Sequence, residues 1–205
     1  MLFVWQTGGG WSLIPSMKAK FVPLFFAALA TFIAIPHSAR TQDAAAAEES
    51  LVAGGLTFKF AKPWERLPSN SPMRAGELKY DHADEAMTDV TVVLYYFGAG
   101  DGGGVEANMQ RWIGQFEGTP AVERETAEVA SREIHYLSAK GTYLDSMPGA
   151  APFAGPKTPK ADYMMLGAVI EDEKGSVFLK MTGPAKSVEA VKAAFKKLAE
   201  SPFAK

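Results

Sequence analysis

From residue 56 onward, apolar and polar residues follow two repeating patterns, and the first of them predicts strands. The stretch 56–60 (Leu-Thr-Phe-Lys-Phe) alternates apolar with polar residues, which is typical of a strand with one buried face. The stretches 91–97 and 162–170 are apolar at both parities, so each needs cover on both faces and belongs in the interior of a sheet. The turn-forming residues 171–175 connect the second of these to 176–181, which predicts a hairpin.

Further stretches complete the predicted sheet and its loops. Residues 73–80 are predicted as a second strand, and residues 81–89 as a polar loop. The alternation within 128–144, interrupted near Gly141, fits either one long bent strand or two short ones. The stretch 147–159 holds four prolines, which predicts a loop.

The second pattern is the spacing of an amphipathic helix, and it occurs twice. Over 104–115 apolar residues recur with helical spacing, and the stripe consists of Val105, Met109, Trp112, Ile113 and Phe116. A second helix is predicted to have Ser187 as its N-cap and lysines toward its C-terminal end, where they interact favourably with the helix dipole. Its apolar face consists of Val188, Val191, Phe195 and Leu198.

These elements predict an α+β fold in a single domain. Short hairpin connections favour an antiparallel sheet, and the two-faced strands require helices on both sides of it. The prediction is therefore an α/β/α sandwich with a mostly antiparallel central sheet flanked by helices. Residues 55–205, about 150 in all, suffice to bury roughly 70% of the surface that the unfolded chain exposes, so one core can sustain the domain.

The N-terminal part of the chain has the layout of a secretory signal peptide. In residues 17–39 two lysines precede an apolar run of 15 residues (21–35), and a proline and small residues follow it. The run is shorter than the roughly 20 residues that cross a bilayer comfortably. Cleavage is expected after Ala39 or within 44–47, which predicts a periplasmic or secreted protein with no stable membrane span after cleavage.

The segments on either side of the signal peptide lead to two more predictions and one alternative. Residues 1–16 carry no charge and fit no targeting pattern, so translation is expected to start at Met17 and residues 1–16 to be a mis-annotated extension. Residues 40–54, with four consecutive alanines, are predicted as a flexible lead-in to the domain. The alternative is that the apolar run stays uncleaved as a membrane anchor.

Composition then narrows the classes of function. The chain of 205 residues has 21 Lys and Arg, 23 Asp and Glu, no Cys and a formal net charge of -2. Without cysteine there is no disulfide framework, thiolate metal site, thiol nucleophile or lipoprotein anchor. Loss of residues 1–39 removes two lysines and no acid, which changes the net charge to -4. Nucleic acid is therefore not an expected partner, because phosphate binding needs a concentrated excess of Lys and Arg.

A glycine-rich stretch, 98–104, lies between a predicted strand and a predicted helix and contains Gly-x-Gly-x-x-Gly. In dinucleotide sites such glycines let backbone N–H groups approach a pyrophosphate at the helix N-terminus. Here Asp101 would place a carboxylate among the phosphate oxygens, and the alternating stretch 127–137 is unlike the buried parallel strand of a βαβ unit. We therefore expect a tight backbone connection and no cofactor.

Few residues are candidates for catalysis or metal binding. The stretch 81–85 (Asp-His-Ala-Asp-Glu) gathers potential ligands, but contiguous acids in a polar loop are more often solvated, and no metal is expected. His135 lies in an alternating stretch, where a lone histidine is usually packed or hydrogen-bonded. No Gly-x-Ser-x-Gly elbow is present for a serine nucleophile.

Aromatic residues form a candidate ligand surface. Trp64, the run 95–97 (Tyr-Tyr-Phe) and Trp112 are its members. Because Trp112 falls on the apolar stripe of the predicted helix, its expected role is core packing. Arg111 lies beside that stripe, at the expected rim of the core, where it could pair with Glu117 or contact an external group.

The order of these elements resembles the PsbP-like family, which includes an extrinsic photosystem II subunit. The resemblance covers about 56–203 and rests on Pro63-Trp64 after the first strand, a hairpin around Gly175 and Ser201-Pro-Phe203 after the last helix. The stretch from Tyr96 to Gly103, with Asn108 and Arg111-Trp112, looks like a marker of uncharacterised exported bacterial proteins similar to that family. The resemblance implies an α/β/α sandwich and a non-catalytic accessory or binding role.

The sequence thus predicts an exported, non-catalytic binding or accessory protein of the cell envelope, whose partner is another envelope protein or a small ligand. Loops carry binding residues more often than strands do, which favours a contact surface at the glycine-rich stretch and the start of the following helix. Its predicted residues are Gly100, Asp101, Gly102, Gly103, Asn108 and Arg111. The alternative is a small-molecule- or metal-dependent enzyme, which requires the 81–85 loop and His135 to converge on one pocket.

Overall fold

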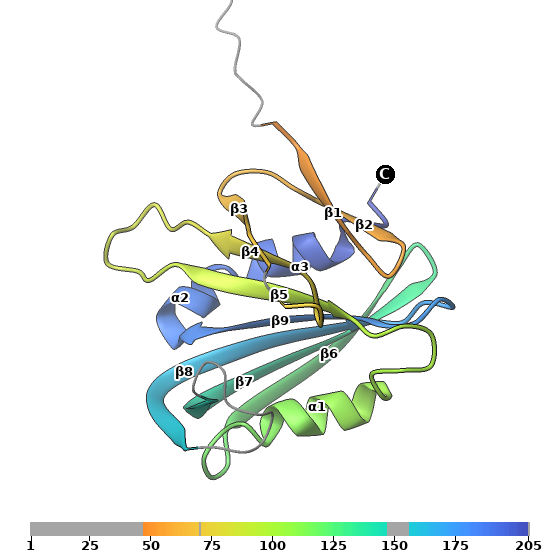
Figure 1. The fold of residues 1–205 in the computed structure, drawn as a ribbon. Helices are drawn as coiled ribbons and strands as arrows, with labels where there is room; N and C mark the ends of the chain where they lie inside the picture. Colours follow the sequence, from red (N-terminus) through yellow and green to blue (C-terminus); the bar gives the residue numbers. More distant parts are fainter. Residues whose placement is uncertain (1–46, 70, 147–155, 205) are drawn as a thin grey trace, which may run out of the picture. The chain divides into compact units, whose positions relative to one another are not determined.

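The computed structural model describes residues 47–69, 71–146 and 156–204, all within one compact unit (Figure 1). The predicted extension 1–16, the predicted signal peptide 17–39 and most of the predicted loop 147–159 lie outside the described residues. Within these ranges, no helix has the length and apolar character that crossing a bilayer requires.

A seven-stranded antiparallel sheet organises the fold, in the order β3-β4-β5-β9-β8-β7-β6 (Figure 1). Its members are β3 (Trp64–Leu67), β4 (Arg74–Tyr80), β5 (Val90–Tyr96), β6 (Ala121–Val129), β7 (Arg132–Ser146), β8 (Lys157–Ile170) and β9 (Val177–Pro184). A separate two-stranded sheet consists of β1 (Glu49–Ala53) and β2 (Leu56–Phe60). The predictions of a mostly antiparallel sheet, of interior positions for the two-faced strands, and of the β8–β9 hairpin are confirmed.

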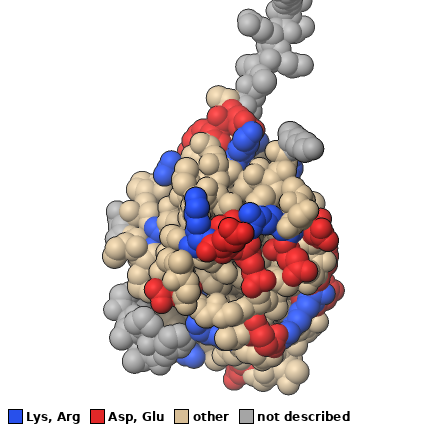
Figure 2. Space-filling view, turned by 90° about the vertical axis from the view of Figure 1, so that its right-hand side faces the viewer, with Lys and Arg blue, Asp and Glu red and all other residues tan. Residues whose placement is uncertain are grey.

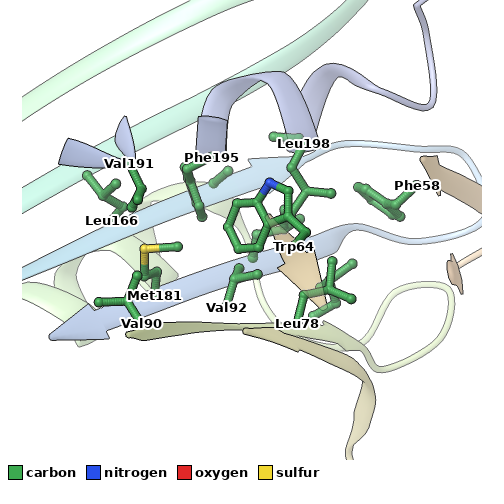
Figure 3. Packing of buried hydrophobic residues seen from close by; sticks show 14 of the residues in the cluster. Phe58, Trp64, Leu78, Val90, Val92, Leu166, Met181, Val191, Phe195 and Leu198 are labelled. Carbon is green, nitrogen blue, oxygen red and sulfur yellow. The ribbon is translucent and has the colours of Figure 1, made fainter. Parts of the chain in front are cut away.

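One face of the seven-stranded sheet carries the larger core. Helices α2 (Ala185–Ala190) and α3 (Lys192–Glu200) and the β1–β2 hairpin pack on this face. Figure 3 shows Phe195 and Leu198 of α3 directed toward the sheet, with Trp64 beside them. Alternate residues of β5, Val92 and Leu94, are fully buried here, which is the pattern expected of a strand that faces a core.

The opposite face carries helix α1 (Val105–Ile113), as predicted from the 104–115 stripe. Met109 and Trp112 of α1 pack with Phe116 against buried residues of β7, β8 and β9, namely Leu137, Ala139, Met165, Val169 and Phe178. The Trp112 ring lies directly on Gly167 of β8, where an added Cβ would be 2.4 Å from the ring. Core packing of Trp112 is therefore confirmed.

Strand β1 corrects the predicted flexible lead-in. The predicted lead-in 40–54 contains β1, in which Leu51 and Ala53 are buried while Val52 between them is 62% exposed. The prediction failed because the alternation extends over only a few residues and follows an alanine run. The folded domain therefore begins earlier than residue 55.

Strand β6 is missing from the sequence-based elements, because it has almost no apolar face. It pairs with β7 at the sheet edge, and ion pairs link it to helices on both faces. Lys192 and Lys196 of α3 lie 2.9 and 2.5 Å from Glu123 and Glu125, and Glu106 of α1 lies 2.8 Å from Arg124. The predicted 128–144 strand therefore corresponds to parts of two strands. It contains the end of β6 and most of the long strand β7, which residues 130–131 connect.

The predicted C-terminal helix is divided into α2 and α3 at Val191. Ser187 is not an N-cap: it lies inside α2, and its Oγ accepts a hydrogen bond of 3.0 Å from the backbone N–H of Thr88. Its role is thus to fix the end of the 81–89 loop to the helix.

Candidate functional site

An open cavity of about 980 Å³ lies beside α1, over β5 and β9, and is named here the α1 groove. Five of the six residues predicted from the glycine-rich stretch and the helix start line it, namely Asp101, Gly102, Gly103, Asn108 and Arg111. Gly100 belongs to the same loop but is not among the lining residues. The sequence thus located one wall of a groove whose other walls come from elements distant in the chain.

The glycine-rich loop bends through backbone conformations that favour glycine. Gly98, Gly100, Gly102 and Gly103 all have positive φ, between 78° and 101°. A Cβ on Gly102 would also lie 2.9 Å from the rings of both Phe97 and Phe178, so the loop can approach the groove wall only without a side chain there.

The loop closes over the N-terminus of α1 through Asn108. This side chain is buried, and its Nδ2 donates to the carbonyl oxygens of Gly102, Gly103 and Gly104 at 2.8, 3.1 and 3.0 Å. The loop therefore directs carbonyl oxygens toward the Asn108 amide, whereas a phosphate-binding loop would present backbone N–H groups. The following strand β6 pairs antiparallel at the far edge of the sheet, so the loop is not part of a parallel βαβ unit.

Asn108 also positions Arg111, one helical turn further along α1. Its Oδ1 accepts a hydrogen bond from Nη2 of Arg111. The hydrogen-bond partner of Arg111 is therefore Asn108 and not Glu117, which corrects the pairing considered from the sequence. Arg111 lines the groove, with its guanidinium oriented by a buried amide.

Aromatic rings form the apolar wall of the groove. The alternation of β5 directs Tyr95 to this face and Tyr96 to the other. The rings of Tyr95 and Phe97 are stacked with centroids 6.1 Å apart, and Phe97 lies 5.8 Å from Phe178 of β9. Of the candidate aromatic surface, Trp64 belongs instead to the other core, where it makes an edge contact with Tyr80.

Lys180 lies in the middle of β9 and lines the α1 groove. Its Nζ donates to Oε1 of Gln115 at 2.5 Å and to the hydroxyl of Tyr143 at 3.2 Å, and lies 5.4 Å from the Tyr143 ring centroid. Nζ forms no ion pair with any carboxylate that the structure describes. Burial lowers the pKa of Lys180 to about 8; Asp145 acts in the opposite direction, and Arg111 in the same direction as burial.

A third basic residue, Arg74 of β4, lines the groove but is paired. Its Nη1 donates to Oε1 of Glu77 at 2.6 Å, and this hydrogen bond raises the pKa of Arg74. The groove therefore presents two cationic groups without carboxylate partners among the described residues, Arg111 and Lys180, beside a single acid, Asp101.

The residues of the alternative, enzymatic hypothesis do not converge. The 81–85 loop follows β4, whereas His135 belongs to β7, four strand spacings away or about 19 Å. The loop is structured by its own contacts, in which Asp84 Oδ1 accepts a hydrogen bond from Ala86 N–H at 2.9 Å. His135 lies instead beside Thr126, Glu133 and Glu171. The pocket that this hypothesis required is not formed.

Sequence reasoning missed Arg74, Phe178 and Lys180 as groove residues. One signal was present: Lys180 is the single charged residue of β9 and follows three apolar residues, Val177, Phe178 and Leu179. A charged residue at an interior strand position implies either a buried partner or an opening in the core, and here the opening is the α1 groove.

The sequence matches no protein-family model and no curated protein. Among solved structures, the chain is similar to cyanobacterial PsbP (CyanoP) from Synechocystis, with 12% identity, a TM-score of 0.44 and coverage of 76% of this chain and 89% of that one. It is also similar to a protein of unknown function from Pseudomonas aeruginosa described as a putative regulator, with 12% identity, a TM-score of 0.40 and coverage of 75% of this chain and 94% of that one. The assignment of the site rests on its geometry alone.

Proposed function

We propose that this chain is an exported, non-catalytic binding protein whose α1 groove holds a small organic anion with an aromatic or otherwise apolar body. The observation that carries the proposal is the pair of cationic groups, Arg111 and Lys180, that face an aromatic-walled groove without carboxylate partners among the described residues.

The chemistry of the groove favours an anion over a neutral ligand. Partial burial of an ammonium group is costly unless the group is paired, and partly buried Lys180 has only the neutral acceptors Gln115 and Tyr143. An incoming carboxylate, sulfonate or phosphate would supply the missing charge, and the Arg111 guanidinium is suited to bind its oxygens. The rings of Tyr95, Phe97 and Phe178 would contact the apolar part of the ligand.

Binding without catalysis fits the residues that line the groove. They include one acid, Asp101, and no histidine, and the hydrogen-bond partners of Lys180 among the described residues are Gln115 and Tyr143, so no base there is hydrogen-bonded to a carboxylate that would orient it. The alternative occupant of the groove is a segment of another envelope protein that presents an acidic and an aromatic residue.

The cellular setting is part of the same proposal. The 17–39 segment supports export to the periplasm or the medium, since its charged start and short apolar run have the layout of a signal peptide. We also assign the fold as an α/β/α sandwich of the PsbP-like type, in an exported bacterial branch. Helices on both faces of an antiparallel sheet support this assignment.

An aromatic sulfonate tests the proposed ligand class directly. Titration with 8-anilinonaphthalene-1-sulfonate is expected to give saturable fluorescence, and the uncharged analogue N-phenyl-1-naphthylamine is expected to bind at least about tenfold more weakly, since about 1.4 kcal/mol of charge interaction suffices for that ratio. Lys180→Met and Arg111→Gln should each weaken sulfonate binding about tenfold. The control Lys186→Met, at an exposed position of α2, should leave it unchanged.

Two results would contradict the proposal. One is equal affinity for the charged and uncharged probes, which would remove the anionic part of the ligand class. The other is sulfonate binding that Lys180→Met and Lys186→Met affect equally, which would place the probe outside the α1 groove.

A further inference from the structure

Three potential metal ligands meet at one end of β7 and β8. Glu133 and His135 are two residues apart on β7, so their side chains lie on the same face of the sheet. Glu171 directly follows β8, whose Ile170 pairs with Ile134. Nε2 of His135 lies 3.4 Å from Oε2 of Glu171 and 3.7 Å from Oε2 of Glu133, and the ligand atoms of all three residues lie within 4.8 Å of one another.

We propose that Glu133, His135 and Glu171 bind one divalent transition-metal ion, of which Zn²⁺ is the representative. The site is separate from the α1 groove, none of whose lining residues it shares.

The separations of the ligand atoms fit such an ion. Zn²⁺ binds imidazole nitrogen and carboxylate oxygen at about 2.0–2.2 Å in tetrahedral geometry, which places neighbouring ligand atoms about 3.3–3.6 Å apart. Of the two separations from His135 Nε2, the 3.4 Å to Glu171 lies within this range, and the 3.7 Å to Glu133 is slightly longer. The two glutamates are exposed, so rotation of their side chains is sufficient to complete the arrangement.

Neighbouring residues hold the imidazole and the turn in place. Nδ1 of His135 lies 3.1 Å from Oγ1 of Thr126, its register partner on β6. Donation from Nδ1–H to this hydroxyl leaves the lone pair of Nε2 directed toward the two carboxylates, which is how histidine ligands are oriented in metal sites. The pair between Arg132 and Asp172, 3.4 Å apart, fixes the residue after Glu171 against β7.

The charge of the cluster also suits a cation. With neutral His135, the cluster carries two negative charges, and the adjacent base Arg132 is paired with Asp172. Figure 2 shows acidic side chains gathered, with basic ones between them, on the side of the molecule that carries the β6–β7 and β8–β9 turns in Figure 1. One imidazole nitrogen with two carboxylate oxygens favours Zn²⁺, Co²⁺ or Mn²⁺ over Ca²⁺ and Mg²⁺, which prefer oxygen ligands alone.

The test is calorimetric titration of the full chain with ZnCl₂ at pH 7.5, after chelator treatment. We expect one ion per chain, with affinity reduced at least about tenfold in His135→Ala and Glu171→Gln. Glu173→Gln, an exposed acid in the same turn, is the matched control and should bind Zn²⁺ as the wild type does. Thr126→Val removes the hydroxyl beside Nδ1 and should weaken binding about tenfold while all three ligands remain.

A spectroscopic readout keeps the proposal open to refutation if a variant folds poorly. Substoichiometric Co²⁺ added to the wild-type chain should broaden the imidazole proton resonances of His135 and leave those of His82 sharp. Equal Zn²⁺ affinity of Glu171→Gln and Glu173→Gln, or equal broadening of the His135 and His82 resonances, would overturn the site.

Discussion

Lys180 shows how one residue links the core to the proposed binding function. It lies in a strand whose other side chains are largely buried, and its Nζ reaches only neutral acceptors, Gln115 and Tyr143. Burial lowers the pKa of Lys180 to about 8, whereas lysine in an unfolded chain titrates near 10.4. The folded state therefore releases this proton at lower pH than the unfolded state does.

This difference predicts that stability rises with pH over a defined window. Between about pH 8 and 10.4 the unfolded state binds more protons, so the free energy of unfolding increases as pH increases. From pH 7.5 to 9.5 the wild-type chain should gain about 2 kcal/mol from this group, as measured by urea unfolding. Lys180→Met should lose this gain, and Lys186→Met should retain it.

The comparison must stay below pH 10, because burial raises the pKa of Tyr95, Tyr136 and Tyr143. Tyrosines of the unfolded chain ionise near pH 10, whereas these three stay protonated in the folded chain. The free energy of unfolding therefore falls as pH rises above 10. An identical pH dependence in wild type and Lys180→Met would show that Lys180 titrates normally.

At the scale of elements, helix α1 and its glycine-rich loop form one unit held by Asn108. The two hydrogens of the amide nitrogen are shared among three carbonyl oxygens within hydrogen-bond distance, and the amide oxygen positions Arg111. A helix N-terminus ordinarily favours a negative charge. In the first turn of α1, however, the side chain of Asn108 points at the carbonyl oxygens of the loop. These oxygens would repel a carboxylate in place of the Asn108 amide.

Substitution of Asn108 tests whether the start of α1 favours a negative charge, as a helix N-terminus does, or repels it, as the carbonyl oxygens of the loop would. Asn108→Asp, which preserves shape, should destabilise the chain at pH 7 by about 2–3 kcal/mol and by more than Asn108→Ala does, because it replaces a buried donor with a charged acceptor. Urea unfolding of both variants gives the comparison. If Asn108→Asp were as stable as the wild type, the α1 N-terminus would be an anion site after all.

Elements with a clear apolar period could be predicted from the sequence, and those stabilised by other means could not. The stripe of α1 and the two-faced strands β5 and β8 are dictated by local patterns. Strand β6 is held by its backbone pairing with β7, beside exposed ion pairs to α1 and α3, and no local pattern contains these contacts. Ser187 looks like an N-cap, but a tertiary hydrogen bond from Thr88 uses its hydroxyl instead.

At the scale of the whole molecule, the α1 groove depends on strand order. Val93 and Lys180 are register partners in the sheet although 87 positions separate them in the chain. The glycine-rich stretch and Arg111 could be predicted because they are contiguous with a helix. The floor of the groove could not, because it depends on β9 lying between β5 and β8.

The N-terminus of the protein isolated from its native host provides a further prediction. Mass spectrometry should find a chain that begins at residue 40 or within 45–48, as expected for signal cleavage after Ala39 or within 44–47. All of these sites precede β1, whose buried Leu51 and Ala53 must remain. An N-terminus that retains residues 17–39 would instead support the membrane-anchor alternative.

The position of β9 has a consequence for the order in which the chain can fold. Strand β5 has β4 on one side, but its other neighbour is made some 80 residues later, after β6, β7 and β8. Until the ribosome has released β9, the inner edges of β5 and β8 both lack a partner, and such non-local pairing closes slowly. We therefore expect the seven-stranded sheet to close only when almost the whole chain has been made, a delay that would suit the export proposed above.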